Sequence, residues 1–104
     1  MSKTEVKKII IRYANELKKK KFPIVSMYLF GSYAKNKANK WSDIDVAVIS
    51  NKLKNSCGKD YERMIYTTLN IDNRIEPHGF TEADFKNLAD PLVYEIRKTG
   101  IKVI

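Results

Sequence analysis

Apolar side chains recur at helical spacing over the first twenty residues of the chain. The positions that share one helical face are Val6, Ile9, Ile10, Tyr13 and Leu17. Ser2 and Glu5 have the spacing of an N-terminal cap, and the lysine run 18–21 suits the negative end of a helix dipole. The pattern therefore predicts a helix that ends at about Lys20, with Pro23 just beyond it.

Short runs rich in β-branched and aromatic residues predict the strands. The first two are Ile24–Phe30 and Asp43–Ser50. A short third strand, Arg74–Glu76, is predicted to stop at Pro77, and Ile101–Ile104 is predicted as the last strand.

Helical patterns separate these strands. A short helix is predicted over Ser32–Ala38, a longer one over Asp60–Leu69, and a last one from Asp90-Pro91 to Gly100. Thr81 with Asp84 predicts a further helix cap. Strands interleaved with helices predict an α/β or α+β fold, with one sheet flanked by helices in a single domain over residues 1–104.

Composition narrows the class of protein. The 104 residues are 43% hydrophobic and 31% charged with only four Gly and three Pro, which excludes collagen-like and disordered low-complexity chains. Cys57 is the single cysteine, so an internal disulfide and a multi-thiolate zinc site are excluded. No apolar run has the length of a membrane span, and the first residues lack the apolar stretch of a signal peptide. The expected location is the cytoplasm.

The net charge of +8 is concentrated in the first part of the chain. Residues 1–41 hold eleven Lys or Arg against two Glu, a net charge of +9. Residues 42–104 hold nine against ten acidic residues, a net charge of −1. This asymmetry indicates a nucleotide, nucleic acid or acidic protein as partner, or only solvated lysine-rich surfaces. Aromatic residues do not alternate with the lysines as a base-stacking platform requires, so nucleic acid is the less favoured partner.

The candidate chemistry lies between the first two predicted strands. Asp43 and Asp45 fall on the same face of a strand, with Cα atoms roughly 6–7 Å apart. Two adjacent carboxylates repel each other unless a cation lies between them, and their hard oxygen ligands suit magnesium. Gly31 and Ser32 precede them at the end of the other strand, where the backbone of a glycine allows close approach of a phosphate.

Three lysines, Lys35, Lys37 and Lys40, add positive charge near these residues. Together the parts describe a nucleoside triphosphate held by its phosphates and bridged through a metal ion to paired carboxylates.

Gly31-Ser32-Tyr33-Ala34 followed by the run Ser42–Val48 resembles the signature of the nucleotidyltransferase superfamily that shares the palm of DNA polymerase beta. The short chain, with no appended domain, resembles the minimal nucleotidyltransferases, the antitoxins of HEPN/MNT toxin–antitoxin pairs. The resemblance implies a mixed sheet flanked by helices, two magnesium ions, ATP as substrate and a HEPN-domain toxin as protein partner. It implies transfer of AMP to a hydroxyl, with a tyrosine of the toxin as the expected acceptor.

The family pattern also assigns residues. It places two metal-binding carboxylates at Asp43 and Asp45, and a third at Glu76 on a later strand, with Asp72 as the second choice. The predicted nucleotide-binding residues are Gly31, Ser32, Lys35 and Ser42. The chain departs from the family at Lys35-Asn36, where Arg-Gly is common. Lysine keeps the charge but loses the two-pronged contact, and asparagine tolerates a left-handed turn.

Other readings of these residues stay open. His78, the only histidine, is expected to be structural more often than functional. Trp41 and Tyr33 flank the site and could stack on a base, but packing is the expected use of each. Two further functions compete with catalysis on a toxin. One is a non-catalytic antitoxin that neutralises the toxin by forming a complex. The other is a drug-modifying nucleotidyltransferase, which the absence of an added helical domain disfavours.

Overall fold

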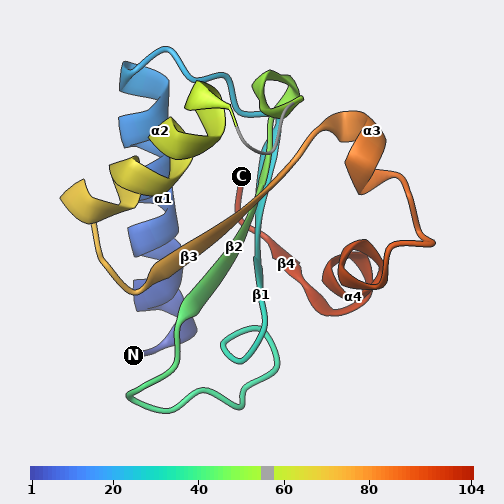
Figure 1. The fold of residues 1–104 in the computed structure, drawn as a ribbon. Helices are drawn as coiled ribbons and strands as arrows, with labels where there is room; N and C mark the ends of the chain where they lie inside the picture. Colours follow the sequence, from blue (N-terminus) through green and yellow to red (C-terminus); the bar gives the residue numbers. More distant parts are fainter. Residues whose placement is uncertain (55–57) are drawn as a thin grey trace.

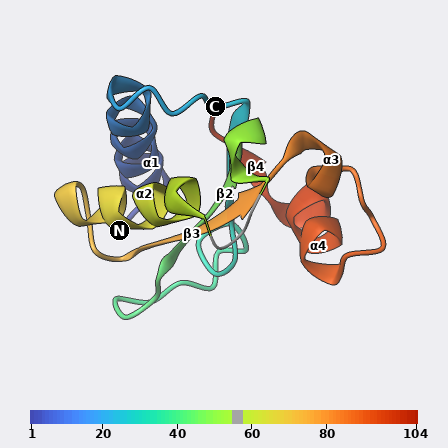
Figure 2. The ribbon, with the colours of Figure 1, turned by 45° about the horizontal axis from the view of Figure 1, so that its top comes forward.

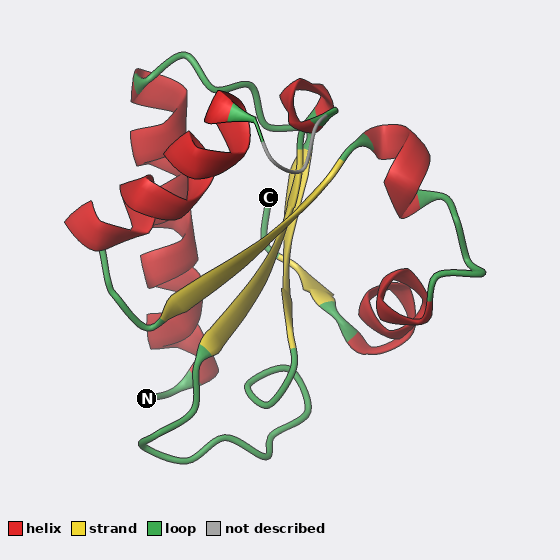
Figure 3. Cartoon of the chain, in the orientation of Figure 1, coloured by secondary structure: helices red, strands yellow, loops and turns green. Residues whose placement is uncertain are grey.

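The computed structural model describes residues 1–54 and 58–104, and its centre is a four-stranded mixed sheet (Figures 1 and 3). The strands are β1 (Ser26–Phe30), β2 (Ile44–Ile49), β3 (Ile75–Phe80) and β4 (Ile101–Lys102), in the order β3-β2-β1-β4. β1 is antiparallel to both β2 and β4, whereas β2 and β3 are parallel. The predicted sheet flanked by helices is confirmed.

Helices cover both faces of the sheet. α1 (Lys3–Lys19) and α2 (Lys59–Thr67) lie on one side, and α3 (Glu82–Phe85) and α4 (Pro91–Thr99) lie on the other (Figures 1 and 2). Two 3-10 turns, η1 (Asn51–Leu53) and η2 (Thr68–Asn70), follow β2 and α2. The helices are capped as predicted: the side chains of Ser2, Thr81 and Asp90 accept backbone N–H groups at the starts of α1, α3 and α4.

Alternate side chains of β2 lie in two separate hydrophobic clusters, one on each face of the sheet. Ile44, Val46 and Val48 are buried in the cluster that includes α1 and α2 residues, while Ala47 and Ile49 are buried with residues of α3 and α4. Asp45 shares the face of Ala47 and Ile49, because side chains alternate along a strand. The helices on that side leave the beginning of β2 open to solvent, and Asp45 is half-buried there.

The predicted helix over Ser32–Ala38 is wrong. These residues form consecutive turns, in which the Lys35 N–H donates to the Gly31 carbonyl (3.1 Å) and the Lys37 N–H donates to the Ser32 carbonyl (2.9 Å). Asn36 has a φ of 59°, a left-handed conformation that a right-handed helix does not accommodate. The expectation that asparagine supports a left-handed turn here is confirmed.

The predicted end of the third strand at Pro77 is also wrong, because β3 continues to Phe80. Pro77 lies opposite Val46 of β2 and has no other neighbouring strand, since β3 is at the edge of the sheet. A proline on an edge strand needs no donor toward the solvent side, so it does not interrupt pairing. The extension is important because it brings His78 into the strand.

The remaining boundaries shift by a few residues. The helix predicted over Asp60–Leu69 runs from Lys59 to Thr67 and continues as η2, and the last strand is confined to Ile101–Lys102. In the described parts of the chain, no helix is long and apolar enough to cross a membrane. Cys57 lies outside the described residues.

A hydrogen bond between helices fixes α1 against α2. The Tyr13 side chain is fully buried, and its hydroxyl donates to the Met64 backbone carbonyl. Burial raises the pKa of the Tyr13 phenol far above its ordinary value, so this side chain remains a donor at any physiological pH.

We expect Tyr13→Phe to lower the free energy of unfolding by about 1–3 kcal/mol, because the buried Met64 carbonyl loses this donor. Urea denaturation measures the change. Tyr66→Phe is the matched control, since the Tyr66 side chain is 63% exposed. Equal stability of the two variants would show that the Tyr13 hydroxyl contributes nothing.

Candidate active site

Asp45 and Glu76 lie side by side at the open end of the sheet. They are register partners in the parallel pairing of β2 with β3, and Asp45 also lies opposite Phe30 of β1. Register partners on neighbouring strands point to the same face and are separated by about 4.8 Å. The pairing therefore forces together two carboxylates that are 31 positions apart in the sequence.

His78 completes a group of three potential metal ligands. One ligand atom each from Asp45, Glu76 and His78 lie within 4.8 Å of one another. The His78 Nε2 atom is 3.8 Å from Asp45 Oδ1 and 3.8 Å from Glu76 Oε1. The edge of its ring packs on Phe30, with the centroids 5.2 Å apart. This donor set of two carboxylates and an imidazole fits a divalent cation.

The predicted strand stops at Pro77 and therefore leaves His78 outside it. Once β3 extends to Phe80, the period of two along a strand places Glu76 and His78 on the same face. The available signal was the spacing Glu-Pro-His, which becomes informative only when the proline is recognised as an edge-strand residue.

Closely spaced negative charges contribute to raised pKa values of Glu76 and His78. The Glu76 side chain is 53% exposed, and its partial desolvation raises the pKa of the carboxyl. The nearby Asp45 and Asp43 carboxylates raise this pKa further. The pKa of His78 is also raised, first by its polar contact with the Asp45 carboxylate and then by the negative charge of Glu76 and Asp45, while burial acts against these effects. A cation between the carboxylates would relieve the same repulsion.

Asp43 stands apart from the three ligands. It is exposed, directly before β2, and is not a member of the metal-binding group among the described residues. Its charge nevertheless contributes to the raised pKa of Glu76. Asp72, the second choice for the third carboxylate, has a different environment. It accepts hydrogen bonds from the Arg74 backbone N–H (2.9 Å) and from Arg74 Nε (2.9 Å) and Nη2 (2.6 Å).

Arg74 holds the pKa of the Asp72 carboxyl below its ordinary value through these side-chain hydrogen bonds, although partial burial acts in the other direction. The role of Asp72 is thus to shape the turn before β3. The geometry favours Glu76 over Asp72 as the partner of Asp45.

Gly31 lies directly against Asp45. Its φ of 75° is in the left-handed region, and a Cβ atom placed on it would be 2.2 Å from Asp45 Oδ2. Only glycine meets both conditions, because any side chain would displace the carboxylate or the turn. The predicted Gly31-Ser32 segment and the carboxylate pair are therefore one structural unit.

The remaining predicted binding residues differ in their exposure and in their side-chain partners. Ser32 is half-buried in the turn. The Lys35 ammonium pairs with the Glu95 carboxylate of α4, a contact across 60 residues that the sequence does not indicate. Lys37 is exposed. Ser42 accepts a hydrogen bond from the Asn39 N–H (2.9 Å) and so stabilises the loop that leads into β2.

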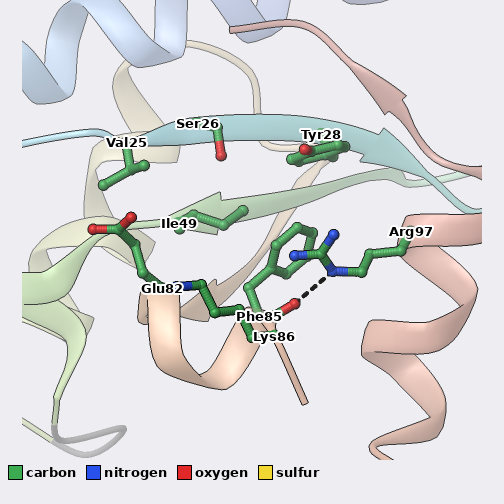
Figure 4. A pocket seen from close by; sticks show the side chains of 8 residues that line it. All are labelled: Val25, Ser26, Tyr28, Ile49, Glu82, Phe85, Lys86 and Arg97. Carbon is green, nitrogen blue, oxygen red and sulfur yellow. Dashed lines mark hydrogen bonds between the residues drawn. The ribbon is translucent and has the colours of Figure 1, made fainter. Parts of the chain in front are cut away.

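A cavity lies on the same face of the sheet, next to the start of β1 and the end of β2 (Figure 4). This cavity of about 150 Å³ is lined mainly by Ser26, Tyr28, Ile49, Phe85, Lys86 and Arg97. Arg97 is already engaged, since its Nε donates to the Phe85 carbonyl (2.6 Å) and its guanidinium lies over the Phe85 ring at 4.7 Å. The cavity shares no residue with the carboxylate group.

This sheet order, with a glycine turn packed against Asp45 and Glu76 beside it on the neighbouring strand, fits a nucleotidyl-transferring domain. Residues 10–100 match the nucleotidyltransferase domain family, and the chain belongs to that family. The chain is also similar to the putative protein adenylyltransferase MJ0126 of Methanocaldococcus jannaschii. The two are 40% identical over 45 residues, which are 43% of this chain and 45% of that protein.

Proposed function

We propose that this domain transfers AMP from ATP to a hydroxyl group of a partner protein in a reaction that requires magnesium. The observation that carries the proposal is the alignment of Asp45 with Glu76 directly behind the Gly31 turn. Membership of the nucleotidyltransferase family supports the reaction class. The similarity to a protein named as a putative protein adenylyltransferase supports a protein acceptor.

The residues predicted from the sequence have distinct roles in this reaction. The Gly31–Ser32 segment, Lys35 and Ser42 bind the triphosphate and orient its α-phosphorus toward the carboxylates. Asp45, Glu76 and Asp43 would hold two magnesium ions. When bound, such ions neutralise phosphate charge and lower the pKa of the acceptor hydroxyl.

In the proposed transfer, one bond to the α-phosphorus forms and another breaks. The acceptor oxygen forms a bond to the α-phosphorus, and the bond from this phosphorus to the bridging oxygen of pyrophosphate breaks. Pyrophosphate leaves with the electron pair of that bond, and the proton of the acceptor passes to solvent. The chain's own contribution is to align the attacking and leaving oxygens and to concentrate negative charge where cations are needed.

We further propose that the partner is a HEPN-domain toxin, that the acceptor is one of its tyrosines, and that modification silences the toxin. This assignment rests on the resemblance to the minimal nucleotidyltransferases. The basic first part of the chain, with a net charge of +9 over residues 1–41, suits an acidic protein surface.

The test is transfer of α-labelled ATP, with magnesium, into a co-expressed HEPN protein that co-purifies with this chain. We expect the label to appear on a tyrosine of the partner and to disappear in the Asp43→Asn/Asp45→Asn double variant. The domain is a non-catalytic antitoxin if the partner binds both the wild-type chain and the double variant without being labelled, and the double variant still protects cells. Label incorporated equally by the double variant would overturn the assigned site.

The ion pair between Lys35 and Glu95 predicts a restraint on triphosphate binding. We expect Glu95→Gln to strengthen ATP binding about 2- to 5-fold. In the variant, Lys35 does not have to break an ion pair with a carboxylate before it contacts a phosphate. Isothermal titration calorimetry with magnesium and ATP measures the change. Glu16→Gln is the matched control, because Glu16 pairs with Lys19 on α1. An unchanged affinity in Glu95→Gln would show that Lys35 is not a phosphate ligand.

A further inference from the structure

Trp41 is the only tryptophan in the chain, and its side chain is 81% exposed. The expectation of packing in the core is wrong for Trp41, whose ring lies at the surface beside the Lys40 ammonium. Tyr33, the other aromatic residue expected to flank the site, is buried as expected. Leaving a tryptophan in water forgoes one of the largest gains that burial offers. Tryptophan is enriched where proteins contact ligands or partners, so Trp41, beside the carboxylates, is a candidate contact residue.

The loop that carries Trp41 is held by its own hydrogen bonds. The Trp41 N–H donates to Asn39 Oδ1 (2.8 Å), and the Ser42 N–H donates to the Asn39 carbonyl (3.1 Å). The Asn39 N–H in turn donates to Ser42 Oγ (2.9 Å). The backbone of this turn is already ordered, so little backbone conformational entropy is lost when Trp41 binds a ligand.

Trp41 is also close to the carboxylates. It stands two residues before Asp43, so their Cα atoms are at most about 7 Å apart. A nucleotide whose phosphates are bound by the Gly31–Ser32 segment beside Asp45 places its base about one nucleoside away from them. The exposed indole ring is within reach of that position.

We propose that Trp41 is the stacking platform for the base of the bound nucleotide, an inference that rests on the proposed function. Stacking of a base on an aromatic side chain contributes about 1–3 kcal/mol and tolerates every base, since all four have a π-face. The Lys40 ammonium lies 5.0 Å from the centroid of the indole ring and helps to hold it. The site therefore binds the four common nucleotides with similar affinity through this contact.

The surroundings of Trp41 favour a small planar ligand over a docked protein. Its sequence neighbours Asn39, Lys40, Ser42 and Asp43 are all polar, and three of the four are exposed. An aromatic anchor of a protein interface usually lies within a well-packed patch that excludes water. An exposed ring next to a lysine and two residues before Asp43 suits a nucleotide, which has a planar base at one end and an anionic chain at the other.

The single tryptophan provides a direct test. Its fluorescence is followed while the full chain, with magnesium, is titrated with ATP, GTP, CTP, UTP or tripolyphosphate, and calorimetry measures the affinity of each. We expect all four nucleotides to quench the emission and tripolyphosphate to bind without comparable quenching. Trp41→Ala should weaken binding of each nucleotide by about 5- to 150-fold and leave tripolyphosphate unaffected. Trp41→Phe should recover most of the loss.

Tyr66→Ala is the matched control, because Tyr66 is an exposed aromatic residue on α2. The inference is overturned if Trp41→Ala binds nucleotides as the wild type does, or if tripolyphosphate quenches as strongly as ATP. It is also overturned if calorimetry detects ATP binding while the emission responds only to a protein acceptor. In each of these cases the proposed function stands. If neither ATP nor tripolyphosphate binds, the proposed function fails as well.

Discussion

Asp45→Asn should abolish nucleotidyl transfer while leaving the fold intact. Asp45 is the residue that the sheet places at the centre of the site, between Phe30 on β1 and Glu76 on β3, with Gly31 against its carboxylate. The amide keeps the shape of the side chain but removes the charge that a cation requires. We expect a rate loss on the order of 10³-fold, about 4 kcal/mol of transition-state stabilisation. Incorporation of α-labelled nucleotide into the acceptor protein measures it.

The same variant has a second readout that does not depend on activity. Because the Asp45 carboxylate is one of the groups that raise the pKa of Glu76, its removal should lower that pKa toward the ordinary value. The partial desolvation of Glu76 remains, so its pKa should stay above the ordinary value. An NMR titration of the side-chain carboxyl in the absence of metal follows this shift. We expect little change in the free energy of unfolding, since the variant relieves the repulsion from Glu76 but loses the attraction to His78.

Asp72→Asn is the matched control. It also removes an acidic group near the beginning of β3, but this carboxylate is bound to Arg74 and is not a member of the three-ligand group. We expect this variant to lose stability and to retain transfer. Wild-type transfer by Asp45→Asn, or a loss of transfer in Asp72→Asn as large as in Asp45→Asn, would contradict the assigned roles.

The helices and strands with a regular pattern of buried apolar residues were predictable from the sequence. The face formed by residues such as Val6, Ile10 and Leu17 identifies α1, and the β-branched interior of 44–49 identifies β2, because one face or both must be buried. The two errors, at residues 32–38 and at Pro77, arise where local propensity is overridden. A left-handed Asn36 interrupts the first segment, and the edge position of β3 tolerates the proline.

The site was predictable only in part, for a related reason. Asp45 and Gly31 carry a signal in their spacing, but the neighbours of Asp45 are set by the pairing of strands that are far apart in sequence. Glu76 enters through the parallel register with β2, and His78 enters only because β3 continues past Pro77. The pair formed by Lys35 and Glu95 depends on how α4 packs on the sheet. Pairwise register and helix packing are tertiary properties, and a single sequence does not state them.

Gly31→Ala should impair both folding and metal binding. The φ of 75° costs a residue with a side chain about 1–2 kcal/mol, and the new Cβ atom would meet Asp45 Oδ2 at 2.2 Å. Either the turn or the carboxylate must move. We expect the free energy of unfolding to fall by about 2 kcal/mol or more and the affinity for a divalent cation to fall by at least about 10-fold. Urea denaturation and calorimetry with magnesium or manganese measure the two effects.

Gly79→Ala separates the two consequences. Gly79 lies on β3 beside His78, yet a Cβ atom there would meet the Leu53, Tyr61 and Met64 side chains in the core against α2, the nearest at 2.8 Å. This variant should lose stability through overpacking while its carboxylate group keeps its affinity for the cation. A loss of metal affinity in Gly31→Ala that exceeds the loss in Gly79→Ala at similar stability would locate the effect at Asp45. Equal losses would mean that metal binding follows global stability, and the close approach of Gly31 to Asp45 would then have no specific role.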